Sequence, residues 1–453
     1  MGWAGLPPLQ AQTVEPAYSV SFSQLPTLGD GSDMTLGTER RLGDRIARSI
    51  YRDPDYIDDP VLAEYVQGIW QPLMAAARLR GDLPPELDQR FAWEIMLGKD
   101  RTVNAFAMPG GYLGVHLGLI AVVTSRDELA SVLGHELSHV TQRHIARLMT
   151  KQNQQAPWMI GAMVLGALAA SKSPDAGSAL MVGGQAVAVQ NQLNFSREME
   201  READRVGFGV MTQAGFEAQG FVTMFDKLQQ ASRLNDNGAY PYLRSHPLTT
   251  ERMADMQARQ PLGASSVINT TLTAEHAIVA ARASVLANAG MDALRAVVLE
   301  ADSARLARQL PAKQAGVLYG AALATTQLRD FKAAQAYLAR LRVIVGPSGA
   351  ASRLTSLLAV EMALAADQMA LAIQAMDVLG NTAKQRPELM LAASVAARSG
   401  QRAMARDAAQ NLQVWVTDHP TDAGAWQQLA TLYAAQGQTL RAIRAEAETQ
   451  VAR

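Results

Sequence analysis

Apolar residues recur at helical spacing over most of this 453-residue chain. Leu42, Ile46 and Ile50 fall on one helical face, and a second amphipathic helix is predicted over residues 60–80. The stretch 1–33 lacks this periodicity and is rich in Pro, Gly, Ser and Gln, so we expect a flexible leader there. Ordered structure is therefore expected from residue 34 onward.

The hydrophobic period changes between residues 90 and 116, where three short strands are predicted. The predicted strands are Phe91–Leu97, Val103–Met108 and Tyr112–His116, and the turn signals Lys99–Asp100 and Pro109–Gly111 separate them. We expect a small antiparallel sheet whose exposed edge borders a cleft. Such an edge can pair with an extended peptide through main-chain hydrogen bonds and so accept many sequences.

A helix is predicted directly after the sheet, because Ser125 and Glu128 form a capping-box pattern ahead of an apolar face. This helix contains the H-E-x-x-H sequence at residues 135–139. Four residues of helix turn through about 400°, so His135 and His139 project from one face and can bind a single cation. Glu136 lies beside them, where a carboxylate can act as a general base on metal-bound water. The alternative is a chance match to a short pattern, so a further ligand is needed.

The best source of that ligand is the segment Glu200–Asp204, whose two terminal carboxylates are four residues apart on one helical face. One carboxylate can bind the metal while the other accepts the outer N–H of a ligating imidazole. The alternative is a solvated, charged helix face. His116 is expected to be structural, since no acidic partner or spacing ties it to the two histidines. His144 is about half a turn around the helix from His135, so we expect it to face elsewhere.

Two uncharged stretches lie between the motif helices, at residues 158–170 and 176–196. The first covers thirteen residues, or about 20 Å of helix, which is short of the ~30 Å hydrocarbon core. A transmembrane span is therefore not expected. The region 158–190 is interpreted as a lid beside the cleft, as buried core or as a peripheral membrane contact, and the sequence leaves these alternatives open.

From about residue 273 the chain becomes alanine-rich and repetitive. The clearest copy follows the tetratricopeptide pattern, with Trp426, Leu429, Ala430, Tyr433, Gly437 and Ala442. Weaker copies are anchored at Ala334, Ala372 and Ala405, with intervals of 38, 33 and 37 residues to the next copy. Stacked helix pairs of this kind build a curved surface that binds extended or helical partners. The alternative is an unrelated alanine-rich helical bundle.

The amino-acid composition limits the classes of partner and of metal ligand that this chain can use. The chain is 48% hydrophobic and 18% charged with a net charge of −1, which does not favour a nucleic-acid partner. Cysteine is absent, so a metal must be held by nitrogen and oxygen ligands. The apolar run near the N-terminus is too short for the hydrophobic region of a signal peptide, so we expect an export signal to be absent or truncated.

Together these motifs resemble the gluzincin metalloproteases of the HtpX-like group, and within it the BepA-type periplasmic proteases of Gram-negative bacteria. The resemblance is carried by H-E-x-x-H at 135–139, E-x-x-A-D at 200–204, N-A-F-A-M-P-G-G-Y at 104–112, S-H-P at 245–247 and the C-terminal repeats. It implies one zinc ion per chain with His135, His139 and Glu200 as ligands and Glu136 as catalytic base. It also implies a periplasmic location and outer-membrane proteins, or their assembly machinery, as partners of the repeats.

The same resemblance places His246 at the metal site, with two roles left open. Its imidazole could occupy the open coordination position and hold the enzyme latent, or it could stabilise the oxyanion formed during peptide hydrolysis. Asp204 is expected to support a ligating histidine from outside. Arg252 is expected to support the site or the oxyanion, with an ordinary helix-surface arginine as the alternative.

The sequence therefore predicts an α+β, zincin-type protease domain over residues 34–262, followed by an all-α tetratricopeptide-repeat domain over residues 273–453. The predicted function is zinc-dependent endopeptidase activity in the quality control of misfolded or stalled outer-membrane proteins. The alternative is a chaperone or assembly factor that acts through its repeats and carries a mostly latent protease site.

Overall fold

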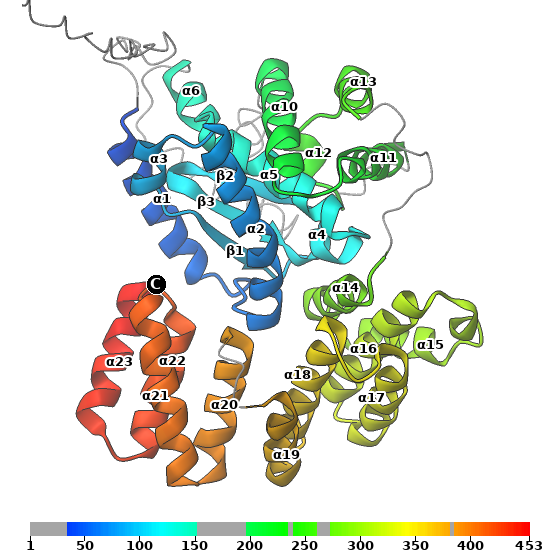
Figure 1. The fold of residues 1–453 in the computed structure, drawn as a ribbon, viewed down its shortest axis with the longest axis vertical. Helices are drawn as coiled ribbons and strands as arrows, with labels where there is room; N and C mark the ends of the chain where they lie inside the picture. Colours follow the sequence, from blue (N-terminus) through cyan, green and yellow to red (C-terminus); the bar gives the residue numbers. More distant parts are fainter. Residues whose placement is uncertain (1–33, 152–195, 234–238, 261–271, 381–384) are drawn as a thin grey trace, which may run out of the picture. The chain divides into compact units, whose positions relative to one another are not determined.

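A small sheet and the helices packed against it form the first part of the fold (Figure 1). The structure is a computed structural model that describes residues 34–151, 196–233, 239–260, 272–380 and 385–453. The predicted leader and the segment 158–190 lie outside these described residues. The elements as far as residue 258 are α1 (Leu36–Tyr51), α2 (Pro60–Arg80), α3 (Pro85–Arg90), β1 (Glu94–Gly98), β2 (Ala105–Met108), η2 (Pro109–Gly111), β3 (Tyr112–His116), α4 (Leu117–Val122), α5 (Arg126–Thr141), α6 (His144–Lys151), α10 (Arg197–Gln213), α11 (Gln219–Arg233), α12 (Tyr242–Ser245) and α13 (Thr250–Ala258).

The sheet is mixed, so the expectation of a purely antiparallel sheet was wrong. Its strand order is β1-β3-β2, with β3 parallel to β1 and antiparallel to β2. The tight turn η2 folds β3 back onto β2, and Gly110 and Gly111 supply its positive φ angles of 76° and 85°. The chain reverses direction between β1 and β2 and again between β2 and β3, so β3 runs in the same direction as β1 and lies between the other two strands. All five residues of β3 are buried, as a central strand requires.

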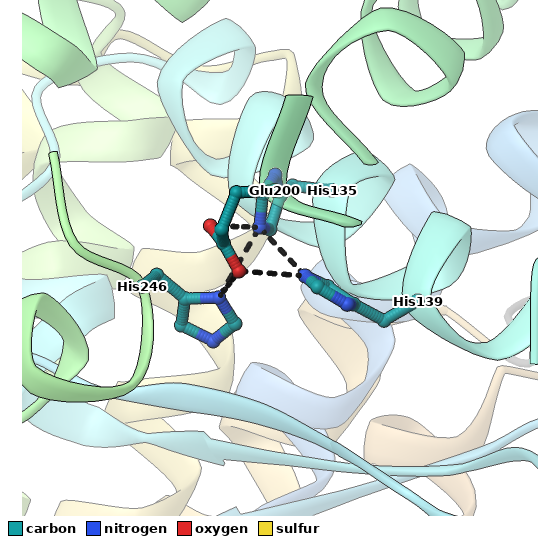
Figure 2. A group of neighbouring side chains, drawn as sticks. All are labelled: His135, His139, Glu200 and His246. Carbon is teal, nitrogen blue, oxygen red and sulfur yellow. Dashed lines mark hydrogen bonds and ion pairs between the residues drawn. The ribbon is translucent and has the colours of Figure 1, made fainter. Parts of the chain in front are cut away.

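Helix α5 begins where the capping pattern predicts. The Ser125 hydroxyl accepts a hydrogen bond from the Glu128 amide at 3.1 Å. Helix α10 crosses α5 at two glycines, and a Cβ atom added at Gly207 would lie 2.9 Å from the Gly134 carbonyl oxygen. The absence of both side chains lets the two backbones approach closely, and this crossing brings Glu200 beside α5 (Figure 2).

The described residues from 272 onward fold into helices, as predicted. Its elements are α14 (Ala274–Ala287), α15 (Met291–Asp302), η3 (Leu306–Arg308), α16 (Pro311–Gln327), α17 (Phe331–Val345), α18 (Ala350–Ala365), α19 (Met369–Leu379), α20 (Arg386–Ser399), α21 (Arg402–Asp418), α22 (Ala423–Ala435) and α23 (Thr439–Ala452). The four alanines that anchor the predicted repeats, at positions 334, 372, 405 and 442, are each the fourth residue of α17, α19, α21 and α23. None of the described helices is long and apolar enough to cross a membrane.

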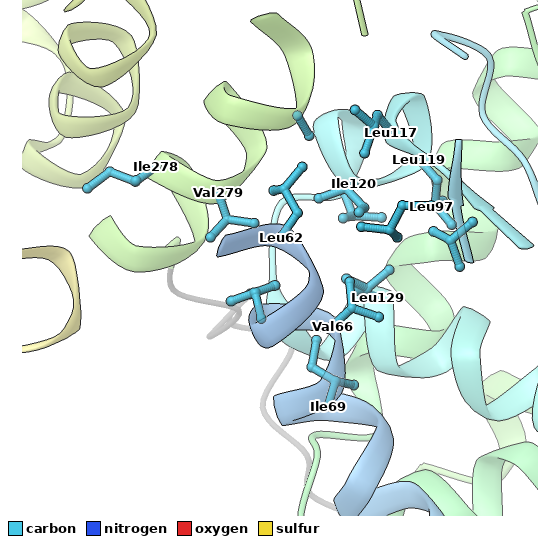
Figure 3. Packing of buried hydrophobic residues seen from close by; sticks show 14 of the residues in the cluster. Leu62, Val66, Ile69, Leu97, Leu117, Leu119, Ile120, Leu129, Ile278 and Val279 are labelled. Carbon is cyan, nitrogen blue, oxygen red and sulfur yellow. The ribbon is translucent and has the colours of Figure 1, made fainter. Parts of the chain in front are cut away.

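Helix α14 joins the two parts of the fold through a shared apolar core. Figure 3 shows Ile278 and Val279 of α14 in the same cluster as Leu62 of α2 and Ile120 of α4. Buried polar contacts reinforce this packing, because the guanidinium of Arg282 on α14 pairs with Asp59, Glu361 and the hydroxyl of Tyr319. The distances are 2.7 Å to Asp59, 2.8 Å to Glu361 and 3.0 Å to Tyr319.

Candidate metal centre

Helix α5 presents two imidazoles to one point, as its H-E-x-x-H spacing predicts. The Nε2 atoms of His135 and His139 lie 2.9 Å apart, and both side chains are buried. Helix α10 adds a carboxylate: the Glu200 oxygens lie 3.5 Å from His135 Nε2 and 3.4 Å from His139 Nε2. Three groups of the residue types that bind zinc therefore converge from two crossing helices.

His246 is the fourth member of this group (Figure 2). Its Nδ1 atom lies 3.0 Å from Glu200 Oε1 and 3.3 Å from His135 Nε2. One ligand atom from each of His135, His139, Glu200 and His246 can be chosen so that all lie within 4.8 Å of one another. Tetrahedral zinc with Zn–N bonds of about 2.0–2.1 Å places its ligand atoms ~3.3 Å apart, so this donor set fits the ion.

The segment that carries His246 is anchored to the sheet. Val103 donates its N–H to the Ala239 carbonyl at 2.8 Å, and its own carbonyl accepts from the Tyr242 amide at 3.4 Å. The ring of Tyr242 also stacks on the His246 imidazole, with centroids 4.5 Å apart. Backbone pairing with Val103, two residues before β2, and ring stacking thus hold His246 next to the other three groups.

The edge of β2 that points away from β3 faces Glu136. The Ala107 amide donates to Glu136 Oε2 at 2.9 Å, whereas the Asn104 carbonyl accepts from His116 N at the end of β3. Because backbone groups alternate sides along an antiparallel strand, the amides and carbonyls of Ala105 and Ala107 point away from β3. The sheet edge that was expected to border a cleft therefore lies beside the candidate base.

Residues 62–260 match peptidase family M48. The chain therefore carries a peptidase M48 domain over these residues. A beta-barrel assembly-enhancing protease of Vibrio cholerae is 34% identical over 70% of this chain, and the aligned chain spans 63% of that relative. The beta-barrel assembly-enhancing protease of Escherichia coli K12 is 29% identical over 96% of this chain and 85% of its own length. Mitochondrial metalloendopeptidase OMA1 of Arabidopsis thaliana is 32% identical over 36% of this chain and 30% of its own length.

A carboxylate and an arginine support the group in this M48 chain from outside. The Asp204 oxygen Oδ1 lies 2.9 Å from His135 Nδ1, on the side of the ring away from the other donors. Arg252 donates to both Asp204 oxygens, at 2.6 and 2.7 Å, and its Nη1 lies 2.7 Å from Glu200 Oε2. Arg252 is 3% exposed, so the alternative of a helix-surface arginine was wrong.

Burial and charge set the protonation of the two glutamates that face the centre. Burial raises the pKa of the Glu136 carboxyl, which lies 3.4 Å from His246 Nε2. Burial also raises the pKa of Glu200, but the nearby His246, His135 and His139 outweigh it and hold that pKa well below its usual range. Glu200 is therefore the ionised carboxylate, as a metal ligand must be, while Glu136 is the carboxyl with the higher proton affinity.

His144 was expected to face away from the two motif histidines, but it contacts His139. Helix α5 ends at Thr141, Arg143 takes a φ of +52°, and α6 begins at His144. This kink turns the imidazole back, so that His144 Nδ1 lies 2.9 Å from His139 Nδ1. The opposite nitrogen of His144 contacts Glu202, a residue that the sequence analysis did not single out. The expectation assumed one continuous helix, and no pattern in the local sequence signals the kink.

His116 lies apart from the four-residue group, as expected. Its Nδ1 is 2.9 Å from the Thr102 hydroxyl and 3.8 Å from Asp100 Oδ2. It has an acidic neighbour after all, but neither contact ties it to the candidate metal ligands.

Proposed function

We propose that this chain is a zinc-dependent endopeptidase with His135, His139, Glu200 and His246 as metal ligands and one zinc ion per chain. The observation that carries the proposal is the convergence of these four buried side chains within 4.8 Å, next to a buried carboxyl at Glu136. The peptidase M48 domain at residues 62–260 supports peptide-bond hydrolysis as the reaction.

Zinc bound at this site would polarise the scissile carbonyl and lower the pKa of a water molecule toward ~7. Glu136 would take a proton from the attacking water and deliver it to the leaving amine, a role for which its raised pKa is suited. Asp204, 2.9 Å from the outer nitrogen of His135, would accept its proton and so keep the other nitrogen directed at the metal. Arg252 holds Asp204 and Glu200 in place, and its donors are directed at these carboxylates and at the Pro247 carbonyl.

An extended substrate is proposed to add to the edge of β2 that points away from β3, beside Glu136. The Ala107 amide already donates to Glu136, so the backbone of Ala105 and the Ala107 carbonyl would form the main-chain hydrogen bonds to the substrate. Such bonds do not depend on the substrate's side chains, which gives broad sequence tolerance. The segment Ala239–Tyr242 already pairs with Val103 at the start of the same edge. A substrate strand that extends along β2 would compete for this pairing and loosen the segment that carries His246, which is how a latent site would open to its substrate.

The biological role proposed is quality control of misfolded or stalled outer-membrane proteins in the periplasm of a Gram-negative bacterium. The names of the Vibrio and Escherichia relatives support this setting. Residues 34–262 would form the protease domain, and residues 273–453 would form a tetratricopeptide-repeat domain that binds the outer-membrane proteins or their assembly machinery. The shared position of the four repeat anchors supports that assignment.

The contact between His246 and the other donors also favours the second candidate, an assembly factor whose protease site is mostly latent. The two functions differ in whether unfolded protein is cleaved at the metal site. The test is digestion of casein by the full chain and by His246→Ala, before and after dialysis against a chelator. The proposal expects cleavage that chelation abolishes and added zinc, but not magnesium, restores. Undiminished cleavage by protein shown to be metal-free would contradict it, and no cleavage by either zinc-loaded protein would favour the assembly factor.

A further inference from the structure

The outer nitrogen of His139 contacts a second imidazole rather than a carboxylate. His139 Nδ1 lies 2.9 Å from His144 Nδ1, and His144 Nε2 lies 3.0 Å from Glu202 Oε2. Arg147, one turn further along α6, places its Nη1 2.8 Å from the same Glu202 oxygen. The chain of contacts thus runs from a candidate metal ligand through α6 to a carboxylate on α10.

The direction of each hydrogen bond follows from the ligand. His139 offers Nε2 to the metal group, so its remaining proton is on Nδ1, which must donate. His144 Nδ1 must then accept, and the single proton of a neutral His144 imidazole lies on Nε2, from which it donates to Glu202. Arg147 neutralises that carboxylate. Every donor meets an acceptor in this arrangement, and the reverse orientation would place two acceptors against each other.

The other histidine ligand, His135, is also supported by a carboxylate that an arginine holds. His135 Nδ1 meets Asp204 directly, and Arg252 holds that carboxylate. Glu202 and Asp204 are two and four residues after Glu200 on α10. Two residues of helix turn through about 200°, so Glu202 points away from the face that carries Glu200. His144 therefore bridges Glu202 and His139, whereas Asp204 reaches His135 without a bridging residue.

We propose that His144 and Glu202 are positioning residues that fix the tautomer and ring orientation of His139 for the metal. The proposal rests on the proposed zinc function and adds a second support to the site. It also couples the site to α6, because the relay begins at the first residue of that helix. Removing a support of this kind lowers metal affinity or activity about 10- to 100-fold.

The test measures zinc affinity of the full-length protein by competition with a chelator of known affinity. His144→Phe fills the space of the ring but offers neither nitrogen, and Glu202→Ala removes the end of the relay. Both are expected to weaken zinc binding about 10- to 100-fold. His144→Gln keeps one acceptor and one donor, so it is expected to retain most of the affinity. Arg205→Ala, an exposed change on α10, is the matched control and should leave the affinity unchanged.

Three comparisons keep this test decisive. The double variant His144→Phe with Glu202→Ala should bind zinc no more weakly than His144→Phe alone, because both changes break one relay. The d–d spectrum of the cobalt-substituted protein should shift in His144→Phe and stay close to wild type in His144→Gln. Unfolding of the metal-free variants separates loss of positioning from loss of folding, and Glu202→Ala serves if His144→Phe does not fold.

Equal zinc affinity in wild type, His144→Phe and Glu202→Ala would overturn the relay while leaving the proposed zinc function standing. Equal losses in His144→Phe and His144→Gln would also overturn it, since hydrogen bonding would then not matter. Absence of zinc binding by the wild-type chain would instead overturn the proposed function itself, together with the relay built on it.

Discussion

Glu136→Gln is expected to bind zinc like the wild-type chain and to lose proteolysis by about 10²- to 10⁴-fold. Glutamine has the shape of glutamate, and its amide oxygen can still accept the hydrogen bond that Glu136 receives from the Ala107 amide. It cannot take a proton from water, so the loss falls on the chemical step and leaves the metal ligands intact. The measurement is the initial rate on an unfolded substrate, with zinc content determined on the same samples.

The matched control for this prediction is Glu251→Gln, the same substitution at a 70% exposed side chain on α13. It should leave the rate unchanged. Comparable turnover by Glu136→Gln and the wild-type chain would rule out Glu136 as the base. A loss of both zinc and activity would show instead that Glu136 supports the metal site.

His246→Ala separates the two roles proposed for that imidazole, because they forecast opposite results. If His246 caps the metal, the change frees a coordination position for water, and cleavage of an unstructured substrate should rise on the order of tenfold or more, together with self-cleavage. If His246 donates to the oxyanion, the rate should fall by about 10²-fold. We favour the cap, because His246 Nδ1 lies 3.0 Å from Glu200 Oε1, within the ligand group itself.

The physical argument for a cap is that an accessible sheet edge with broad specificity endangers neighbouring proteins unless water is kept from the metal. Stacking on Tyr242 and pairing of the segment with Val103 hold His246 in place by contacts that a substrate can replace. His419→Ala, at an exposed histidine of the helical region, is the control and should not change the rate. Zinc content must be measured in His246→Ala, because losing a ligand also weakens metal binding. A fall in rate at full zinc occupancy would contradict the cap.

Features set by local sequence were predictable. The cap at Ser125, the helical face that pairs His135 with His139, and the position of each strand depend on residues within a few turns of one another. The strand order could not be predicted, because the turn at Pro109–Gly111 indicates that the chain reverses but not which strand lies at the centre of the sheet.

The contact of His144 with His139 was missed for a similar reason. The positive φ at Arg143 coincides with long-range contacts: its guanidinium binds Glu39 in the first turn of α1 and the carbonyl of Met34, which precedes that helix. Neither contact can be read from the residues around position 143. Glu202 was not singled out from the sequence, because its partners His144 and Arg147 lie on α6, more than fifty residues earlier in the chain.

Metal analysis of the purified wild-type chain and of His135→Ala tests the central claim most directly, because it asks whether these residues hold zinc. The account predicts about one equivalent of zinc per wild-type chain and a difference of about one equivalent between the two proteins. The apo forms should unfold at similar denaturant concentrations, which excludes misfolding as the cause. Equal zinc content in the two proteins would contradict the account.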